Sequence, residues 1–539
     1  MTAQAAEVMT HHVRDAVVTG AALHVGSLDP RQVMNIDVVL PVRNRMDLDA
    51  LVKAVGDPAS MMYRQYLTPA QFTEKFGPTQ ADYDTVVKYL VKNGFTITGG
   101  SRDGMEIQAR GPVMSVEAAF NLRMLTWQHP TENRVFFAPD REPTTALAIP
   151  LWHVSGLDNY SIPHPLYEKK SDYAKAHGIS PDAVVSHATT GSGPSASFLG
   201  SDMRAAYYGG SLTGTGQTLG LFEYYGTDLA DLTTYYKNVK QTNNVPVTLI
   251  STDGTSTACL YTKAGGDCDD GEQNLDLTQA LGMAPGLTGV SFFVGSTDTA
   301  IISAMTTHTP LASVNSCSCG WTPEDASTLD PYFEKMATQG QTFFVASGDD
   351  STWKKTGDAE SWPADDAYII AVGGTDLTTA SAGGAWKSET AWTDSGGGIS
   401  PNKIAIPSWQ KLSGVITSTN KGSTSYRNGP DVAANANFTF YTCGDQKACQ
   451  ANEYGGTSFA APMWAAFIAL ANQQSVANGG KTLGNFNATI YPIGVSSSYS
   501  TNFHDITSGK SGSYSAEVGF DLVTGWGSPQ AALINTLAQ

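Results

Sequence analysis

The strongest constraint on the fold is an alternation, from about residue 216 onward, of short apolar runs with stretches of helical periodicity. Near-continuous apolar strands separated by helices are typical of a parallel sheet that is buried on both faces. The runs that we expect to form strands are 218–222, 247–250, 290–294, 312–314, 342–346 and 368–372. We therefore predict a doubly wound α/β domain, whose functional site would lie at the carboxyl ends of the strands.

Residues 31 to about 150 have a different pattern, which predicts a compact α+β unit. We expect strands at 33–40, 105–110 and 135–138, and helices around 48–55, 70–76, 80–93 and 115–122. This order, β-α-α-β-α-β, indicates an antiparallel sheet with helices on one face, close to the ferredoxin-like pattern. After residue 157 the periodicity is lost and Pro163, Pro165 and Pro181 appear, so we expect an exposed linker up to residue 195.

The charge balance limits the partners that the chain can have. Its 539 residues carry a formal net charge of -18 at pH 7, which argues against nucleic acid or an anionic membrane as a partner. A low pI with few basic residues suits a protein that works in acid. No apolar run is long enough to span a bilayer, and residues 1–20 lack the apolar core of a secretory signal. Export would then use another route, or a signal that has been trimmed.

All six cysteines lie in the second two-thirds of the chain, at positions 259, 268, 317, 319, 443 and 449. Cys259 with Cys268, and Cys443 with Cys449, bracket short loops that suit local disulfides and an oxidising compartment. Cys317 is too close to Cys319 in sequence to bridge without strain. Zinc is the weaker alternative, because the sulfurs lack paired C-x2-C spacing and nearby histidines. The pairing stays open at this point.

The stretch 454–462, Tyr-Gly-Gly-Thr-Ser-Phe-Ala-Ala-Pro, brings small residues up to a single serine, Ser458, at the start of an apolar helix. Glycines allow a substrate backbone to approach closely, and a helix start offers free N–H groups and a positive dipole end. Ser458 is therefore a candidate nucleophile. A Gly-Thr-Ser turn that caps a buried helix is the alternative.

A serine nucleophile needs a base, and His308 and His504 are the only histidines after residue 195. Neither lies in a glycine-rich context, which disfavours a Ser-His-Asp triad. Glu272 and Asp276 stand at i and i+4 at the start of a predicted helix through residue 283, so they share one face. Two adjacent carboxylates do not both ionise easily, and one keeps a proton. The pair could supply a base in acid, or it could be a solvated helix start favoured by the dipole.

A third candidate, Asp349, follows the predicted strand 342–346 within the stretch Ser347-Gly348-Asp349. A protonated carboxyl group at the end of this strand could donate a hydrogen bond to an oxyanion. An Asp-Gly turn without a chemical role is the alternative.

Glu272-x-x-x-Asp276, Ser347-Gly348-Asp349 and Gly456-Thr457-Ser458 occur in this order, and together they resemble the sedolisins, or serine-carboxyl peptidases. Further matching stretches are Pro363 with 371–375 (Ala-Val-Gly-Gly-Thr), 395–400 (Ser-Gly-Gly-Gly-Ile-Ser), 407–410 (Pro-Ser-Trp-Gln) and 429–432 (Gly-Pro-Asp-Val). The front unit resembles the activation prodomain of the family, above all at 63–69 (Tyr-Arg-Gln-Tyr-Leu-Thr-Pro). The resemblance extends from about residue 30 to the end.

The resemblance implies a subtilisin-like fold and a Ser-Glu-Asp triad. By this match Ser458 is the nucleophile, Glu272 the general base and then acid, and Asp276 the residue that orients Glu272. Asp349 stands where the family has its oxyanion-stabilising carboxylic acid. The implied activity is that of an acid-active endopeptidase that hydrolyses peptide bonds through an acyl-enzyme.

The resemblance also implies a self-processing proenzyme. Residues 1–156 would be the activation prodomain, with an N-terminal extension at 1–30, and would inhibit the enzyme within the same chain. Residues 157–195 would be the linker, with the processing site between about 186 and 198, and residues 196–539 the peptidase domain. We expect a secreted monomer that acts on proteins or peptides.

Near the C-terminus, Asp505 and Asp521 could provide hard oxygen ligands of the kind that Ca²⁺ prefers, with two Asx-turns as the alternative. The resemblance implies one Ca²⁺ ion, held by these two carboxylates and by the carbonyl oxygens of Ile506, Glu517 and Gly519. The family usually has glycine where Glu517 stands. It also commonly has tryptophan at the position of Cys319, near the acidic residues and the substrate cleft.

Two other functions stay open. One is a subtilisin-type peptidase with His308 or His504 as its base. The other is a calcium-dependent binding protein that has the fold without the activity, and the complete set of Ser458, Glu272, Asp276 and Asp349 argues against it.

Overall fold

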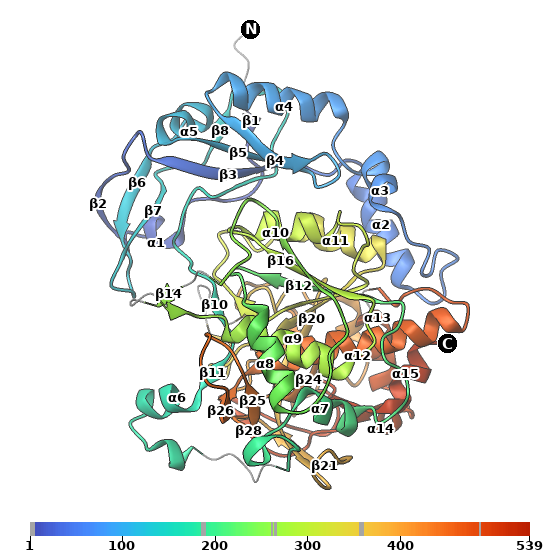
Figure 1. The fold of residues 1–539 in the computed structure, drawn as a ribbon. Helices are drawn as coiled ribbons and strands as arrows, with labels where there is room; N and C mark the ends of the chain where they lie inside the picture. Colours follow the sequence, from blue (N-terminus) through green and yellow to red (C-terminus); the bar gives the residue numbers. More distant parts are fainter. Residues whose placement is uncertain (1–5, 185–189, 260–261, 264–266, 355–360, 485–486) are drawn as a thin grey trace.

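The computed structural model of the chain describes residues 6–184, 190–259, 262–263, 267–354, 361–484 and 487–539. An N-terminal domain, blue in Figure 1, rests on one side of a larger C-terminal domain that runs from green to red. A connecting segment passes from the first domain along the second, past the labels β10 and β11.

Eight strands form the central sheet of the larger domain, in the order β13-β16-β12-β17-β19-β20-β21, with β24 also paired to β20. Neighbouring strands are parallel except for β20 and β21. The strands are β12 (Thr218–Glu223), β13 (Val247–Ser251), β16 (Gly289–Val294), β17 (Val314–Cys317), β19 (Thr342–Ala346), β20 (Ile370–Thr379), β21 (Trp386–Ala391) and β24 (Val432–Asn435). The predicted doubly wound sheet is confirmed, and β21 and β24 extend it beyond the six predicted strands.

Both faces of this sheet are buried, as the apolar runs predicted. In β19, Phe344 and Ala346 belong to one core cluster, whereas Phe343 and Val345 belong to the other. This alternation follows from the two-residue repeat of a strand. The helices around the sheet are α8 (Leu229–Asn238), α9 (Gly271–Met283), α10 (Asp298–Met305), α11 (Asp330–Gln339) and α12 (Thr457–Ala477).

Helix α12 is the central helix of the first cluster. It packs against α9 on one side and against β17, β19 and β20 on the other. Its residues from Thr457 to Asn472 are all buried, and a helix that is apolar on every side has to lie inside a large core. Because α9 and α12 are held together, the side chains at their starts have fixed relative positions.

The N-terminal domain has a four-stranded antiparallel sheet in the order β4-β5-β3-β9. Its elements follow one another as β3 (Val33–Val39), α2 (Arg45–Gly56), α3 (Pro69–Lys75), α4 (Gln80–Lys92), β4 (Thr96–Ser101), β5 (Glu106–Pro112), α5 (Val113–Phe120) and β9 (His153–Ser155). The predicted ferredoxin-like arrangement is confirmed. Strand β4 was not predicted, because Gly99 and Gly100 lower the strand propensity of this segment.

The last strand of this sheet was predicted wrongly. Residues 135–138 do form a strand, β7 (Val135–Pro139), but β7 pairs with β6 (Met124–Gln128) in a separate sheet with β2 (Leu23–Ser27). Phe136 and Ala138 turn into a small cluster with Ala22 instead of the main core of the domain. The place at the sheet edge is taken by β9, whose three residues are too few to be recognised from a pattern.

The segment predicted as an exposed linker is partly buried and paired. It contains β10 (His164–Pro165), β11 (Glu168–Lys169) and α6 (Lys170–Ala176), and Leu166 is only 2% exposed. Strand β10 pairs antiparallel with β18 (Cys319–Gly320), and β11 pairs antiparallel with β26 (Gln450–Gly455). The prediction of exposure is wrong here because the extended backbone completes two sheets of the larger domain.

Helices α2 and α3 of the N-terminal domain pack against α11 of the larger domain. At this contact Arg45 forms an ion pair with Glu334, whose side chain is fully buried, and Tyr368 donates a hydrogen bond to the same carboxylate (2.8 Å). Arg45 also pairs with Asp49 on the surface (2.9 Å). The burial of Glu334 raises its pKa to about 7.

We predict that Arg45→Met destabilises the full chain above neutral pH but not in acid. Losing the partner of a fully buried carboxylate costs about 3–5 kcal/mol, and the partial exposure of Arg45 should reduce this to about 1–2 kcal/mol. The loss should shrink at pH 5, because Glu334 is then protonated. Thermal unfolding at pH 8 and pH 5 measures both values. The surface variant Asp49→Asn is the control, and an equal effect of Arg45→Met at both pH values would contradict the prediction.

Candidate active site

Ser458 lies in the first turn of α12 and is fully buried. Its hydroxyl donates a hydrogen bond to Glu272 Oε2 (3.0 Å) and also lies 3.3 Å from the Ser318 carbonyl oxygen. The preceding Gly456 has φ 136°, a conformation that favours glycine. The hydroxyl is thus held beside a carboxylate at the start of a helix, where backbone N–H groups have no partner within the helix.

Glu272 is the first member of a buried group of three carboxyls. Hydrogen bonds join Asp276 to Glu272 on one side and to Glu223 on the other, which requires protons shared between the acids. Ser318 Oγ donates to Asp276 Oδ1 (2.7 Å), and Gln273 Nε2 donates to Glu223 Oε2 (3.0 Å). The chain of contacts therefore runs from the serine hydroxyl through three acids.

The pKa values of all three acids are raised. Burial, followed by the charges of Asp276 and Glu223, raises the pKa of Glu272 well above its ordinary value. Burial raises the pKa of Asp276 to about 7, and burial with the charge of Asp276 raises that of Glu223. These groups bind protons more readily in the folded chain than in the unfolded one. Their contribution to stability therefore falls as the pH rises from the ordinary carboxyl pKa towards the raised values.

Asp349 lies on the opposite side of Ser458, after β19. Its Oδ1 atom accepts hydrogen bonds from the backbone N–H and the hydroxyl of Thr457, both at 2.8 Å. A β-carbon at Gly456 would collide with Asp349 Oδ2 and with the carbonyl oxygen of Leu166. The Asp349 carboxyl and the Leu166 carbonyl thus face the same small space, which only glycine leaves open.

The connecting segment runs through this site as an extended peptide. The N–H group of Leu166 donates to the Ser318 carbonyl (2.9 Å), and the Leu166 carbonyl accepts from the N–H group of Ser458 (3.1 Å). Strands β10 and β11 lie before and after this residue. Addition of an extended strand to sheet edges is a common mode of peptide binding. The cleft has a volume of about 510 Å³ and is lined by Glu223, Glu272 and Cys319 among others.

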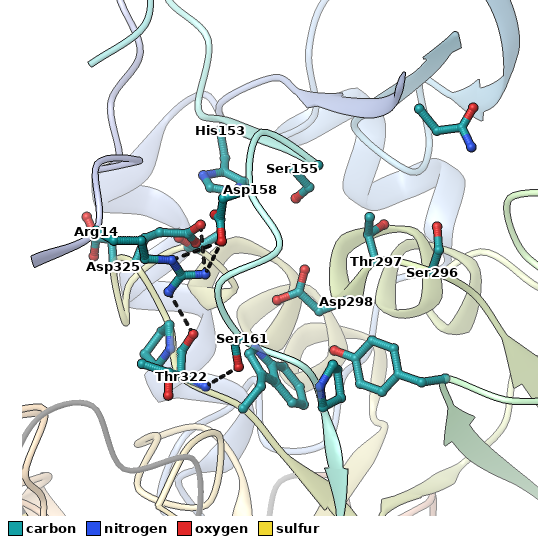
Figure 2. Close-up of a pocket in the computed structure, with 18 of the residues that line it drawn as sticks. Arg14, His153, Ser155, Asp158, Ser161, Ser296, Thr297, Asp298, Thr322 and Asp325 are labelled. Carbon is teal, nitrogen blue, oxygen red and sulfur yellow. Dashed lines mark hydrogen bonds and ion pairs between the residues drawn. The ribbon is translucent and has the colours of Figure 1, made fainter. Parts of the chain in front are cut away.

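A second cavity, of about 360 Å³, lies where the two domains meet (Figure 2). Arg14 crosses this contact: its guanidinium binds Asp158 (3.0 Å) and Glu324 (2.9 Å) and donates to the Thr322 carbonyl (2.8 Å). The N–H group of Thr322 donates to Ser161 Oγ (2.9 Å), as Figure 2 shows. Arg14 belongs to the N-terminal extension, which therefore helps to hold the segment that enters the cleft.

The structure also brings together the predicted calcium ligands. The N–H group of Gly519 donates to Asp505 Oδ1 (3.1 Å), and that of Glu517 donates to Asp521 Oδ2 (3.0 Å). Ile506 follows Asp505 and is buried. Neither aspartate has a Lys or Arg ion-pair partner among the described residues. The oxygens of both carboxylates accept hydrogen bonds from backbone N–H groups and hydroxyls, and neither has a basic partner among these residues. Carboxylate oxygens are ligands that a hard divalent ion prefers.

Both histidines of the alternative triad lie away from the serine. His504 stacks on Trp386 with 4.0 Å between ring centroids, and His308 packs edge-on against Phe293 (5.5 Å). The hydroxyl of Ser458 has Glu272 as its side-chain partner instead. The geometry gives no support to a histidine base.

Sequence reasoning missed two residues of this site. Glu223 ends β12, directly after the predicted strand 218–222, and an acid at the carboxyl end of a parallel strand is a usable signal. Leu166 carries no such signal, because its position in the cleft depends on pairing with β18 and β26, which are distant in sequence.

Two cysteine pairs lie at disulfide distance: 1.91 Å separates the sulfurs of Cys259 and Cys268, and 2.02 Å those of Cys443 and Cys449. Cys317 and Cys319 are unbridged and buried, with 2.9 Å between their sulfurs. Within the described ranges, no helix combines the length and apolar character needed to cross a membrane.

The chain is similar to known proteins along nearly its whole length. Residues 21–160 match the family described as "Pro-kumamolisin, activation domain", and residues 238–509 match the "Subtilase family". Kumamolisin of Bacillus sp. (strain MN-32) is 29% identical over 97% of this chain and 94% of the relative. Sedolisin of Pseudomonas sp. (strain 101) is 29% identical over 96% of this chain and 90% of the relative.

Among solved structures, Pseudomonas sedolisin is 27% identical with a TM-score of 0.50, and the match covers 65% of this chain and 97% of that one. That structure is described as a serine-carboxyl proteinase complexed with two molecules of pseudo-iodotyrostatin. Fold, domain content and relatives agree, and the chain belongs to the subtilase family, as a serine peptidase of the sedolisin type with an N-terminal activation domain.

Proposed function

We propose that this peptidase is an acid-active serine-carboxyl endopeptidase that cuts its own chain between Leu166 and Tyr167. The observation that carries the proposal is the Leu166 carbonyl, which accepts a hydrogen bond from the N–H group of Ser458 beside a hydroxyl bound to Glu272. This is the position that a peptide carbonyl needs for attack by the serine.

The residues then have the following roles. Ser458 Oγ attacks the Leu166 carbonyl carbon while Glu272 takes the hydroxyl proton, and the resulting oxyanion is stabilised by the Ser458 N–H group and a protonated Asp349. Glu272 returns the proton to the departing amine of Tyr167, which leaves Leu166 as an acyl-enzyme. Water hydrolyses this ester with Glu272 again as the base. Asp276 and Glu223 orient Glu272 and hold the protons that keep the buried acids from repelling one another.

Acid should also release the N-terminal domain, which we propose to be an intramolecular inhibitor. Burial would raise the pKa of Asp158, but the charge of Arg14 and the hydrogen bonds from Glu324, Tyr160 and Arg14 together lower it. The Asp158–Arg14 contact is therefore fully formed above the ordinary aspartate pKa, and its stabilising contribution is lost as the pH falls through the lowered value. Secretion of the enzyme is supported by the two cysteine pairs at disulfide distance.

The proposed bond lies ahead of the window 186–198 that the composition of the linker suggested. Residues 186–189 of that window lie outside the described residues. At its other end Phe198 is fully buried and its N–H group donates to the Thr439 carbonyl (2.7 Å), so this end is held inside the peptidase domain.

We predict that acid treatment of the intact protein yields a first fragment that begins at Tyr167, and that Ser458→Ala abolishes this cut. Time-resolved mass spectrometry at pH 4 measures both. Ser496→Ala, on the surface and remote from the cleft, is the control and should be cut at the native rate. A first fragment that begins beyond residue 186, or cutting of the Ser458→Ala chain on its own, would contradict the prediction.

We predict that Glu223→Gln moves the acid limb of the kcat/KM profile to lower pH. The charge of Glu223 contributes to the raised pKa of Glu272, so its removal lowers that pKa and leaves the base ionised further into acid. The profile is measured on a peptide substrate from pH 2 to 7. Glu453→Gln, which changes an acid outside the three-carboxyl group, is the control and should leave the acid limb unmoved. A shift of the acid limb of Glu223→Gln to higher pH would count against Glu272 as the base.

We also propose a single Ca²⁺ ion held by the carboxylates of Asp505 and Asp521 and the carbonyl oxygens of Ile506, Glu517 and Gly519. When bound, the ion would neutralise the two carboxylates and join loops near the C-terminus, without taking part in the reaction. Its expected effect is on stability.

Adding Ca²⁺ at about a hundredfold excess over its dissociation constant to the chelator-treated protein should raise the melting temperature by about 4 °C. Asp521→Asn should remove this response, whereas Asp228→Asn, an acid that caps a distant helix, should retain it. Differential scanning calorimetry at pH 6 makes the comparison. An equal response of native protein and Asp521→Asn would place the ion elsewhere.

A further inference from the structure

The residues that follow Leu166 in the cleft show how the enzyme could recognise its substrates. Strand β11 lies antiparallel to β26, with Glu168 opposite Gly455 and Lys169 opposite Tyr454. Successive side chains of an extended strand point to opposite faces, so Tyr167 and Lys169 share one face. Both lie against Tyr454: the rings of Tyr167 and Tyr454 are 5.6 Å apart, and Lys169 Nζ lies 5.2 Å from the centre of the Tyr454 ring.

Lys169 also has a carboxylate partner. Its Nζ atom lies 3.3 Å from Asp445 Oδ2, and the side chains of Lys169 and Asp445 are 19% and 5% exposed. An ammonium group between a carboxylate and an aromatic face gains from both the ion pair and the cation–π contact. The contact is mostly removed from water, so it is less screened than a surface ion pair.

Asp445 is held rigidly in place. Its Oδ1 atom accepts from the N–H group of Asp270 (3.1 Å), and its own N–H group donates to Asp270 Oδ1 (2.7 Å). It lies in the short loop between Cys443 and Cys449, whose sulfurs are at disulfide distance. Asp270 directly precedes α9, the helix that carries Glu272. A carboxylate that is fixed before binding loses little conformational freedom when a cation arrives.

We propose that Asp445 and Tyr454 form a specificity subsite that selects a lysine or arginine side chain three residues after the cleaved bond. The proposal rests on the proposed function, because it takes Leu166–Tyr167 as the cleaved bond. In the proenzyme the subsite is filled by Lys169. In the active enzyme it would accept the corresponding basic residue of a foreign polypeptide.

The first test uses the full chain. Lys169→Met should slow the acid-induced cut after Leu166 about tenfold, the combined effect expected for a partly buried ion pair and a cation–π contact. Lys170→Met is the matched control, since it removes the neighbouring lysine, for which no contact with Asp445 exists among the described residues. Equal rates for the two variants would overturn the proposal.

The second test uses the acid-activated enzyme at pH 5 with two quenched peptides that contain Pro-Leu-Tyr-Glu-Lys or Pro-Leu-Tyr-Glu-Met. The native enzyme should have a kcat/KM about tenfold higher for the lysine peptide. Asp445→Asn should reduce this preference to about twofold or less by lowering kcat/KM for the lysine peptide only. The methionine peptide should be unaffected, because asparagine keeps the side-chain oxygen that accepts from the N–H group of Asp270. Asp445→Lys should prefer a third peptide with glutamate at that position.

The outcomes separate the two proposals. Cleavage of the lysine and methionine peptides at equal rates by the native enzyme would overturn the subsite and leave the peptidase intact. Failure of the native enzyme to cut either peptide after leucine would overturn the proposed cleavage position, and the subsite with it.

Discussion

The active site depends on the burial of three carboxyl groups side by side next to a single serine, which is energetically unfavourable. Glu272, Asp276 and Glu223 could not all be charged in this space, because like charges in a poorly solvated interior repel strongly. The fold accommodates them with shared protons and with neutral donors, the hydroxyl of Ser318 and the amide of Gln273. In the proposed mechanism a serine peptidase can work without a histidine base, because Asp276 and Glu223 retain protons and Glu272 carries the charge that the base needs.

In the proposed mechanism the same backbone groups serve both inhibition and catalysis. The N–H group of Ser458 and the carbonyl of Ser318, which would hold a foreign substrate, already hold Leu166 of the connecting segment. The N-terminal domain places this segment through contacts that are distant from the serine, such as those of Arg14. Under this proposal inhibition needs no separate element, because the cleft is filled with a peptide whose ends are anchored in two domains.

Sequence patterns were sufficient to predict elements that depend on interactions between residues close in sequence. The six predicted strands of the main sheet are present because buried parallel strands have to be apolar throughout, and Glu272 and Asp276 share a face because of the helical repeat. Patterns failed where tertiary pairing decides: β9 is three residues long, and Leu166 is buried only because β18 and β26 flank it. Asp349 was identified by the resemblance to the sedolisins and not by periodicity. Its Gly-Asp sequence alone is equally compatible with a turn that has no chemical role.

The pairing of β11 with β26 brings together distant parts of the chain, and beside it Lys169 contacts Asp445, which lies 276 positions further on. The gene thus encodes a peptide ligand together with the cleft that receives it, and both are inherited as one unit. If the chain cuts itself as proposed, a mutation in the cleft changes the cut in the connecting segment before it changes the cleavage of any foreign protein. On this proposal the sequence of the connecting segment reflects the substrate preference of the cleft, and a change in one should select for a compensating change in the other.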